Sequence, residues 1–142
     1  MITCTRKLEF CAGHRVMGHE GKCRNLHGHQ YAVLLEARGL DESLDTLGRV
    51  IDFSVLKAEV GAWIEQEWDH GFLLYDQDRE AIGACDRVEG QKMFLLPANP
   101  TAENIAEHLL RVVCPMLLDR RGVQVRKVTV WETPNCFATA EL

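Results

Sequence analysis

The chain has 142 residues, of which 46% are hydrophobic and 26% charged, a balance typical of a folded globular protein. This length fits one domain around one hydrophobic core. Sixteen basic against twenty-one acidic residues give a net charge of -5, which argues against a nucleic acid partner. Because no apolar run approaches the ~20 residues of a membrane helix and residues 1–10 lack a signal-peptide core, we expect a cytoplasmic protein with no membrane partner.

Two segments near the amino terminus alternate apolar and polar residues, which is typical of half-buried strands. The first begins at Thr5 and places Leu8, Phe10, Ala12 and His14 on one face. The second, residues 27–39, places His27 and His29 on the same face as the apolar residues that follow them. Residues 17–26 contain two glycines and several charged residues, so they are predicted to form a loop between antiparallel strands.

Apolar residues then repeat at helical spacing in two segments. One helix is predicted over residues 51–68, with Asp52 capping its amino end. The second is predicted from about Thr101, and we expect Pro115 to kink or end it. The six cysteines are predicted to be free thiols, because an even number without a secretion signal is weak evidence for disulfides.

Two further strands are predicted at the carboxyl end, over residues 123–133 and 136–142, with Pro134 and Asn135 as the turn. The element order is therefore β-β-α-α-β-β, and the predicted class is α+β. Residues 76–98 form a long connection in which the sequence KMFLLP could add a short strand.

The histidines indicate a metal site. In a strand, residues two apart project from the same side about 6.6 Å apart, so His27 and His29 can reach one ion. If the two strands pair, His14 can reach the same ion as His27 and His29. Three histidines match the three protein ligands of a catalytic zinc. His19 could replace His14 as a ligand. Alternatively, Cys23 and the three histidines could close a four-ligand structural site, which would make the chain a non-catalytic zinc-binding module.

Two acidic positions add to this pattern. Asp69 stands beside His70, and a carboxylate next to an imidazole can raise its basicity for proton transfer, although such a pair can also end a helix in solvent. Glu132 is in phase with the apolar residues of its strand, so its carboxylate needs a partner, and a guanidine-like heterocycle edge would supply two parallel N–H donors.

The sequence resembles the 6-pyruvoyl-tetrahydropterin synthase / 6-carboxytetrahydropterin synthase family over nearly the whole chain. The resemblance rests on FCAGH, CRNLHGHQY, VIDFSVLK, WDHGFLL, NPTAENIA and VWETPN, which occur in the family's order and spacing. Because three residues separate Cys23 from His-Gly-His, the chain is most similar to the queuosine-pathway branch.

This resemblance implies a tunnelling fold (T-fold), with a four-stranded antiparallel sheet and two helices on one face. Three chains would close a barrel, and two trimers would stack as a homo-hexamer. The implied activity is zinc-dependent conversion of 7,8-dihydroneopterin triphosphate to 6-carboxy-5,6,7,8-tetrahydropterin, with release of triphosphate and acetaldehyde. The alternative within the family is 6-pyruvoyl-tetrahydropterin synthase.

The resemblance also implies roles for single residues. The metal ligands would be His14, His27 and His29, the general base would be Cys23, and the proton relay would be Asp69 and His70. The pterin would be anchored by Glu132 and flanked by Thr101 and Glu103. Arg15, Lys22 and Arg24 could receive the triphosphate or could be solvated loop charges.

The chain departs from the family pattern at Gly13, where alanine is common, and at Trp68, where leucine is common. Residues 76–98 are also longer than in compact members. This segment directly follows the relay pair, so we expect it to reshape the pocket and to affect substrate preference.

Overall fold

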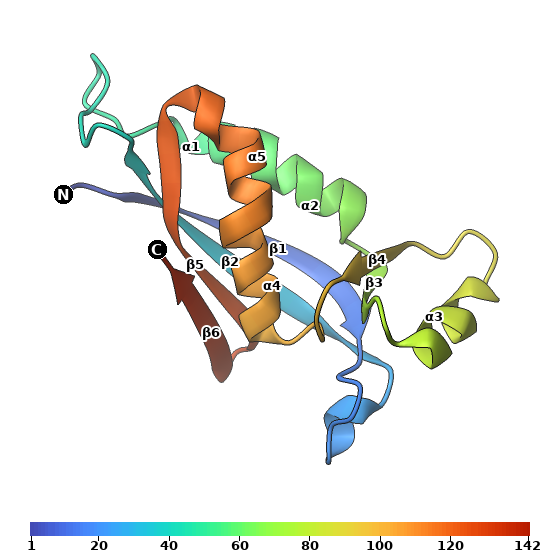
Figure 1. Cartoon of the computed structure of the whole chain (residues 1–142). Helices are drawn as coiled ribbons and strands as arrows, with labels where there is room; N and C mark the ends of the chain where they lie inside the picture. The colour runs from blue at the N-terminus through green and yellow to red at the C-terminus, as the bar shows by residue number, and fades with distance from the viewer.

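The structure is a computed structural model that describes residues 1–142. Its main feature is a six-stranded sheet in the order β4-β3-β1-β2-β5-β6 (Figure 1). The strands are β1 (Cys4–His14), β2 (His27–Gly39), β3 (Gly71–Tyr75), β4 (Met93–Leu96), β5 (Val123–Thr133) and β6 (Cys136–Glu141).

The four predicted strands pair antiparallel as β1-β2-β5-β6. Strands β1 and β2 pair from Cys4 opposite Ala37 to His14 opposite His27. This register matters for the site, because opposite residues in an antiparallel pair have their side chains on the same face. His14 therefore lies beside His27 at the end of the hairpin.

The prediction of a four-stranded sheet was incomplete, because β3 and β4 extend it with parallel pairs. Strand β3 pairs with Ala12–His14 of β1, and β4 pairs with β3. A short parallel strand is a continuous apolar run and lacks the period-two alternation that revealed the other strands. The predicted short strand in KMFLLP is confirmed as β4.

Two long helical segments cover one face of the sheet, as predicted (Figure 1). The first consists of α1 (Phe53–Leu56), a π-helical stretch (Lys57–Gly61) and α2 (Ala62–Glu67). The second consists of α4 (Ala102–His108), a π-helical stretch (Leu109–Val113) and α5 (Cys114–Leu118). Asp52 caps the first by accepting a hydrogen bond from the Ser54 N–H. Between helices and sheet lies a core of 24 buried residues.

The second helix does not end at Pro115, because α5 continues to Leu118, and a kink at this proline stays a prediction. A π-helical stretch lies directly before this proline, and such stretches relax the hydrogen-bond pattern where a donor is missing. The segment ends at Gly122, whose φ of 72° is readily adopted by glycine.

The long connection over residues 76–98 contains a helix that the sequence did not reveal, α3 (Arg79–Asp86). It packs on β3 through a small cluster of Leu74, Ala81 and Cys85, so β3, α3 and β4 form a parallel unit at one edge of the sheet. No helix has both the length and the apolar character needed to span a membrane.

Candidate metal centre and active site

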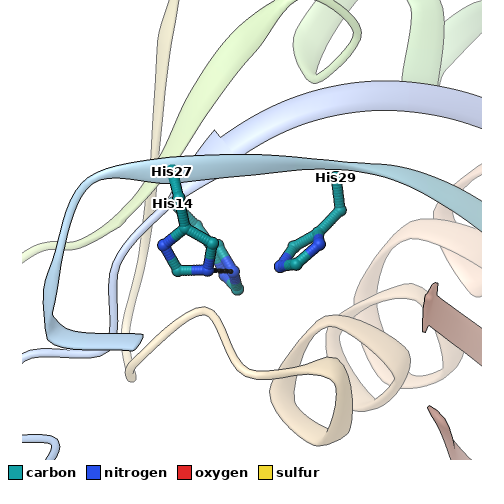
Figure 2. A group of neighbouring side chains, drawn as sticks. All are labelled: His14, His27 and His29. Carbon is teal, nitrogen blue, oxygen red and sulfur yellow. Dashed lines mark hydrogen bonds between the residues drawn. The ribbon is translucent and has the colours of Figure 1, made fainter. Parts of the chain in front are cut away.

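The ligand atoms of His14, His27 and His29 all lie within 4.8 Å of one another. The three imidazoles come from β1 and β2 and point to the same side of the hairpin (Figure 2). The two Nε2 atoms of His14 and His27 are 3.2 Å apart. Two nitrogens that bind one zinc tetrahedrally at 2.0–2.1 Å are separated by about 3.3 Å, so this spacing fits a shared ion.

Backbone carbonyls orient two of these rings. The Nδ1 atom of His14 lies 2.7 Å from the carbonyl oxygen of Pro100, and Nδ1 of His27 lies 2.6 Å from that of Asn25. Because a carbonyl only accepts, each Nδ1 carries the proton and each Nε2 is left with a free lone pair. Neither Pro100 nor Asn25 was predicted to orient these rings, since contacts through the main chain do not depend on side-chain identity.

His29 provides a second indication that the cluster suits a metal. Its Nε2 is buried and has no hydrogen-bond partner, which is costly for a polar atom unless something binds it. Burial also lowers the pKa of His29, and that of His14 to about 4, so both rings are neutral at pH 7 as metal ligands must be. Neutral imidazole nitrogens suit zinc and exclude calcium or magnesium as the preferred ion.

Glu132 lies beside the histidines, at the end of β5. Its Oε1 is 3.4 Å from Nε2 of His14 and 3.7 Å from Nε2 of His29. The carboxylate was predicted to need a partner, and the structure places it next to the cluster. A molecule bound at the open side of the three nitrogens would therefore contact Glu132.

A hollow of about 200 Å³ opens next to Glu132. Cys23, Thr101 and Glu103 all line it, so the structure brings these predicted residues together. Thr101 also caps α4, because its hydroxyl accepts a hydrogen bond from the Asn104 N–H. The hollow combines two thiols, two carboxylates and a hydroxyl, and its residue Glu132 also lies beside the nitrogens of His14 and His29.

Cys23 does not belong to the set of donor atoms that converge within 4.8 Å. His19 is outside this set as well, and its Nδ1 instead accepts a hydrogen bond from the Gly21 N–H. Burial, Glu132 and Cys23 raise the pKa of Tyr31, whose ring lies against His14 and His29. Cys23 therefore lies outside the converging donor set, which argues against a closed four-ligand site.

Asp69 and His70 lie away from this hollow. Asp69 accepts hydrogen bonds from the Cys11 N–H at 2.9 Å and pairs with Nδ1 of His70 at 2.7 Å. His70 is 79% exposed and lines a second hollow, to which His27 and His29 also contribute. The side chains of Cys11 and Gln30, which line it too, alternate with the site histidines along their strands and so face the opposite side of the sheet. Within one chain, no hydrogen bond or ion pair joins Asp69 or His70 to the three histidines, and neither residue belongs to the converging donor set.

The Asp69 carboxylate is held in its charged form. Burial raises its pKa, but the hydrogen bond from Cys11 and the contact with His70 outweigh that effect and keep the pKa below its usual value. His70 has a φ of 62°, which is uncommon for a residue with a side chain and turns the imidazole outward before β3 begins. Such a strained position is often found at functional sites.

The candidate triphosphate residues differ in availability. Arg15 is 18% exposed and its guanidinium bonds to Asp78, so it is already engaged within the chain. Lys22 and Arg24 are exposed on the short 3-10 helix (Lys22–Arg24).

The departure at Gly13 also has a physical reason, because a Cβ there would lie 2.4 Å from the ring of Phe72.

We expect the metal-free protein to lose stability as the pH falls from about 6.5 to about 4. Burial and the neighbouring His27 and His29 lower the pKa of His14 to about 4, although the hydrogen bond to Pro100 opposes them. Between these pH values the unfolded state binds a proton that the folded state lacks, so stability rises with pH, and acidification removes at most about 3 kcal/mol.

Urea unfolding of chelator-treated protein between pH 4 and 7, compared with His14→Asn, measures this contribution. The variant should show a shallower dependence on pH than the unsubstituted protein. Parallel curves for the two proteins would show that His14 does not titrate in this way.

The family model described as 6-pyruvoyl tetrahydropterin synthase matches residues 3–142. A relative from Rickettsia bellii, named 6-carboxy-5,6,7,8-tetrahydropterin synthase, is 42% identical over 96% of this chain and 98% of its own length. Among solved structures, an uncharacterized protein from Wolinella succinogenes has a TM-score of 0.79 at 24% identity, covering 99% of this chain and 97% of its own. The 6-pyruvoyl tetrahydropterin synthase of Caenorhabditis elegans has a TM-score of 0.69 at 25% identity, with coverages of 99% and 95%.

The α+β fold, with its sheet order and helices, is a T-fold, and the three converging histidines form a candidate metal centre in it. The chain belongs to the 6-pyruvoyl tetrahydropterin synthase family. It is an enzyme of the lyase type.

Proposed function

We propose that the chain is a zinc-dependent 6-carboxy-5,6,7,8-tetrahydropterin synthase. It converts 7,8-dihydroneopterin triphosphate and one water to 6-carboxytetrahydropterin, triphosphate and acetaldehyde. The observation that carries the proposal is the convergence of His14, His27 and His29 beside the hollow that Cys23 lines. The name of the 42% identical relative supports the carboxy product over the pyruvoyl one. Incubation with this substrate and identification of the product by mass tests the proposal.

In this proposal His14, His27 and His29 would hold zinc. When bound, zinc supplies Lewis acidity that makes the side-chain hydroxyls of the substrate and the adjacent C–H more acidic. Cys23, in the hollow beside the histidines, accepts the proton as general base. Glu132 anchors the pterin through two charge-assisted hydrogen bonds, and Thr101 and Glu103 flank the ring.

A second copy of the chain would complete the site. Strand β3 covers only Ala12–His14 of β1, so the edge of β1 is open over residues 4–10, and β6 is open at the other end of the sheet. Open strand edges readily pair with another chain. Pairing β6 of one copy with this edge of the next closes a three-chain barrel, and two barrels stack as a homo-hexamer.

The same pairing explains where the relay pair acts. Continuing the antiparallel order brings the Cys136 end of a neighbour's β6 to the end of β1 that adjoins Asp69 and His70. Cys136 lines the same hollow as Glu132 and Cys23. The relay of one copy would therefore serve the hollow of the next, as a single chain keeps them apart.

The setting proposed for this enzyme is the cytoplasm, with the chain acting as a single domain and without nucleic acid or membrane partners. All six cysteines are free thiols, which suits a reducing compartment. The net charge of -5 disfavours nucleic acid.

We expect Glu132→Gln to weaken substrate binding much more than zinc binding. The amide replaces one carboxylate oxygen, so one charge-assisted hydrogen bond to the pterin is lost at a cost of roughly 1.5–3 kcal/mol, which raises KM about 10- to 150-fold. Zinc should stay, because the three histidines remain.

Steady-state kinetics and metal analysis measure both effects, with Glu107→Gln as a control on the exposed side of α4. An unchanged KM would show that Glu132 does not anchor the pterin. Loss of zinc from Glu132→Gln would show that Glu132 is instead a metal ligand.

A further inference from the structure

The loop over residues 15–26 carries Cys23, whereas the three histidines lie on β1 and β2. Within the loop, the Val16 N–H donates a hydrogen bond to the Cys23 carbonyl at 2.7 Å. Most of its other residues are exposed, and its only regular element is the 3-10 helix at Lys22–Arg24. Exposed loops with few internal contacts are mobile unless other parts of the chain hold them.

Asp78 holds the loop at its first residue. Arg15 donates from Nε to Oδ2 of Asp78 at 2.6 Å and from Nη2 to Oδ1 at 2.5 Å. Asp78 is 1% exposed, and its Oδ1 also accepts from the Ala81 N–H, so the same carboxylate caps α3. A buried carboxylate with this two-pronged arginine contact is a strong and directional tie.

Asn99 holds the loop two residues further on. Its side-chain oxygen accepts from the Met17 N–H at 2.9 Å, and its side-chain nitrogen donates to the Met17 carbonyl at 3.0 Å. The next residue, Pro100, accepts the hydrogen bond from Nδ1 of His14. Residues 99 and 100 therefore contact both the cysteine loop and a metal-binding histidine.

We propose that Asp78 and Asn99 are positioning residues that fix the Cys23 loop relative to the three histidines. The two ties hold Arg15 and Met17, on either side of Val16, which bonds to the Cys23 main chain. This inference rests on the proposed role of Cys23. It also gives the long segment after β3 a function, since that segment supplies Asp78 and the helix that it caps.

Asp78→Asn and Asn99→Ala test the two ties, with Glu80→Gln as the matched control. Glu80 also approaches Arg15, but at 3.6 Å and with 87% of its side chain exposed. Since small displacements of a reacting group cost up to about 100-fold in rate, we expect kcat to fall roughly 10- to 100-fold in each variant with zinc content unchanged. The second readout is the rate at which iodoacetamide alkylates Cys23, followed by peptide mass spectrometry. In Asp78→Asn and Asn99→Ala this rate should change several-fold. In Glu80→Gln, both kcat and the alkylation rate should match those of the unsubstituted protein.

The alkylation rate reports the position of Cys23 without requiring turnover. If the unsubstituted protein lacks activity, the proposed function fails, but an altered Cys23 rate in the variants still supports the two ties. Variants with a lower melting temperature but unchanged kcat and unchanged Cys23 alkylation would overturn the inference and leave a purely structural role. If Asp78→Asn does not fold, the milder Asn99→Asp, which keeps the acceptor and loses the donor to Met17, decides the question by the same readouts.

Discussion

Replacing Cys23 with serine is expected to leave zinc content near that of the unsubstituted protein and to reduce turnover about 10²–10⁴-fold, on the order of 3–5 kcal/mol of barrier. A serine hydroxyl is too weakly acidic to serve as the same base near neutral pH. Zinc should remain because the converging donor set consists of the three histidines and does not include Cys23.

Metal analysis, a thermal melt and turnover on the same preparation measure this prediction. Cys85→Ser is the control, because Cys85 is a thiol of α3 that lies outside this hollow. A Cys23→Ser protein that has lost zinc and melts early would contradict the assignment. In that case Cys23 would be a ligand of a structural site, and its loss would remove folding stability together with the metal.

Mixing two inactive variants is expected to restore activity if the relay acts between copies. Cys23→Ser lacks the base and His70→Asn lacks the relay, but a mixed oligomer contains sites with one intact residue from each chain. Random assembly in equal amounts makes about one quarter of the sites complete, so activity should return to about one quarter of that of the unsubstituted protein.

Coexpression with two different affinity tags isolates the mixed oligomers for this assay. The control mixes Cys23→Ser with a Cys23→Ser/His70→Asn double variant, in which no site can be complete. If the mixed oligomers form but stay inactive, the Asp69–His70 pair does not serve a neighbouring hollow.

The parts of the fold that could be predicted are those with a local periodic signal. Strands β1 and β2 alternate on a half-buried face, so the phase that buries Phe10 and Tyr31 also brings His14 to the side of His27 and His29. This is why the convergence of the three histidines could be predicted from the sequence alone. The cap at Asp52 and the turn after β5 have equally local signals.

The remaining features depend on contacts between distant segments. Strand β3 shows no alternation of apolar and polar residues, because it lies between two parallel neighbours. The sequence also did not indicate that β3 pairs with Ala12–His14 of β1. Arg15 was a candidate for binding triphosphate until Asp78, which is 63 positions away, proved to engage it. The separation of His70 from the three histidines likewise follows from tertiary packing, since an adjacent Asp-His pair gives no information about which face of the sheet it occupies.

The most direct test of the proposed function is the product formed from 7,8-dihydroneopterin triphosphate by the zinc-loaded protein. Mass spectrometry should identify 6-carboxy-5,6,7,8-tetrahydropterin, and acetaldehyde and triphosphate should appear in equal amounts. A pyruvoyl product without acetaldehyde would show that the enzyme only eliminates triphosphate. No product from a protein that is folded, zinc-loaded and assembled would contradict the proposal.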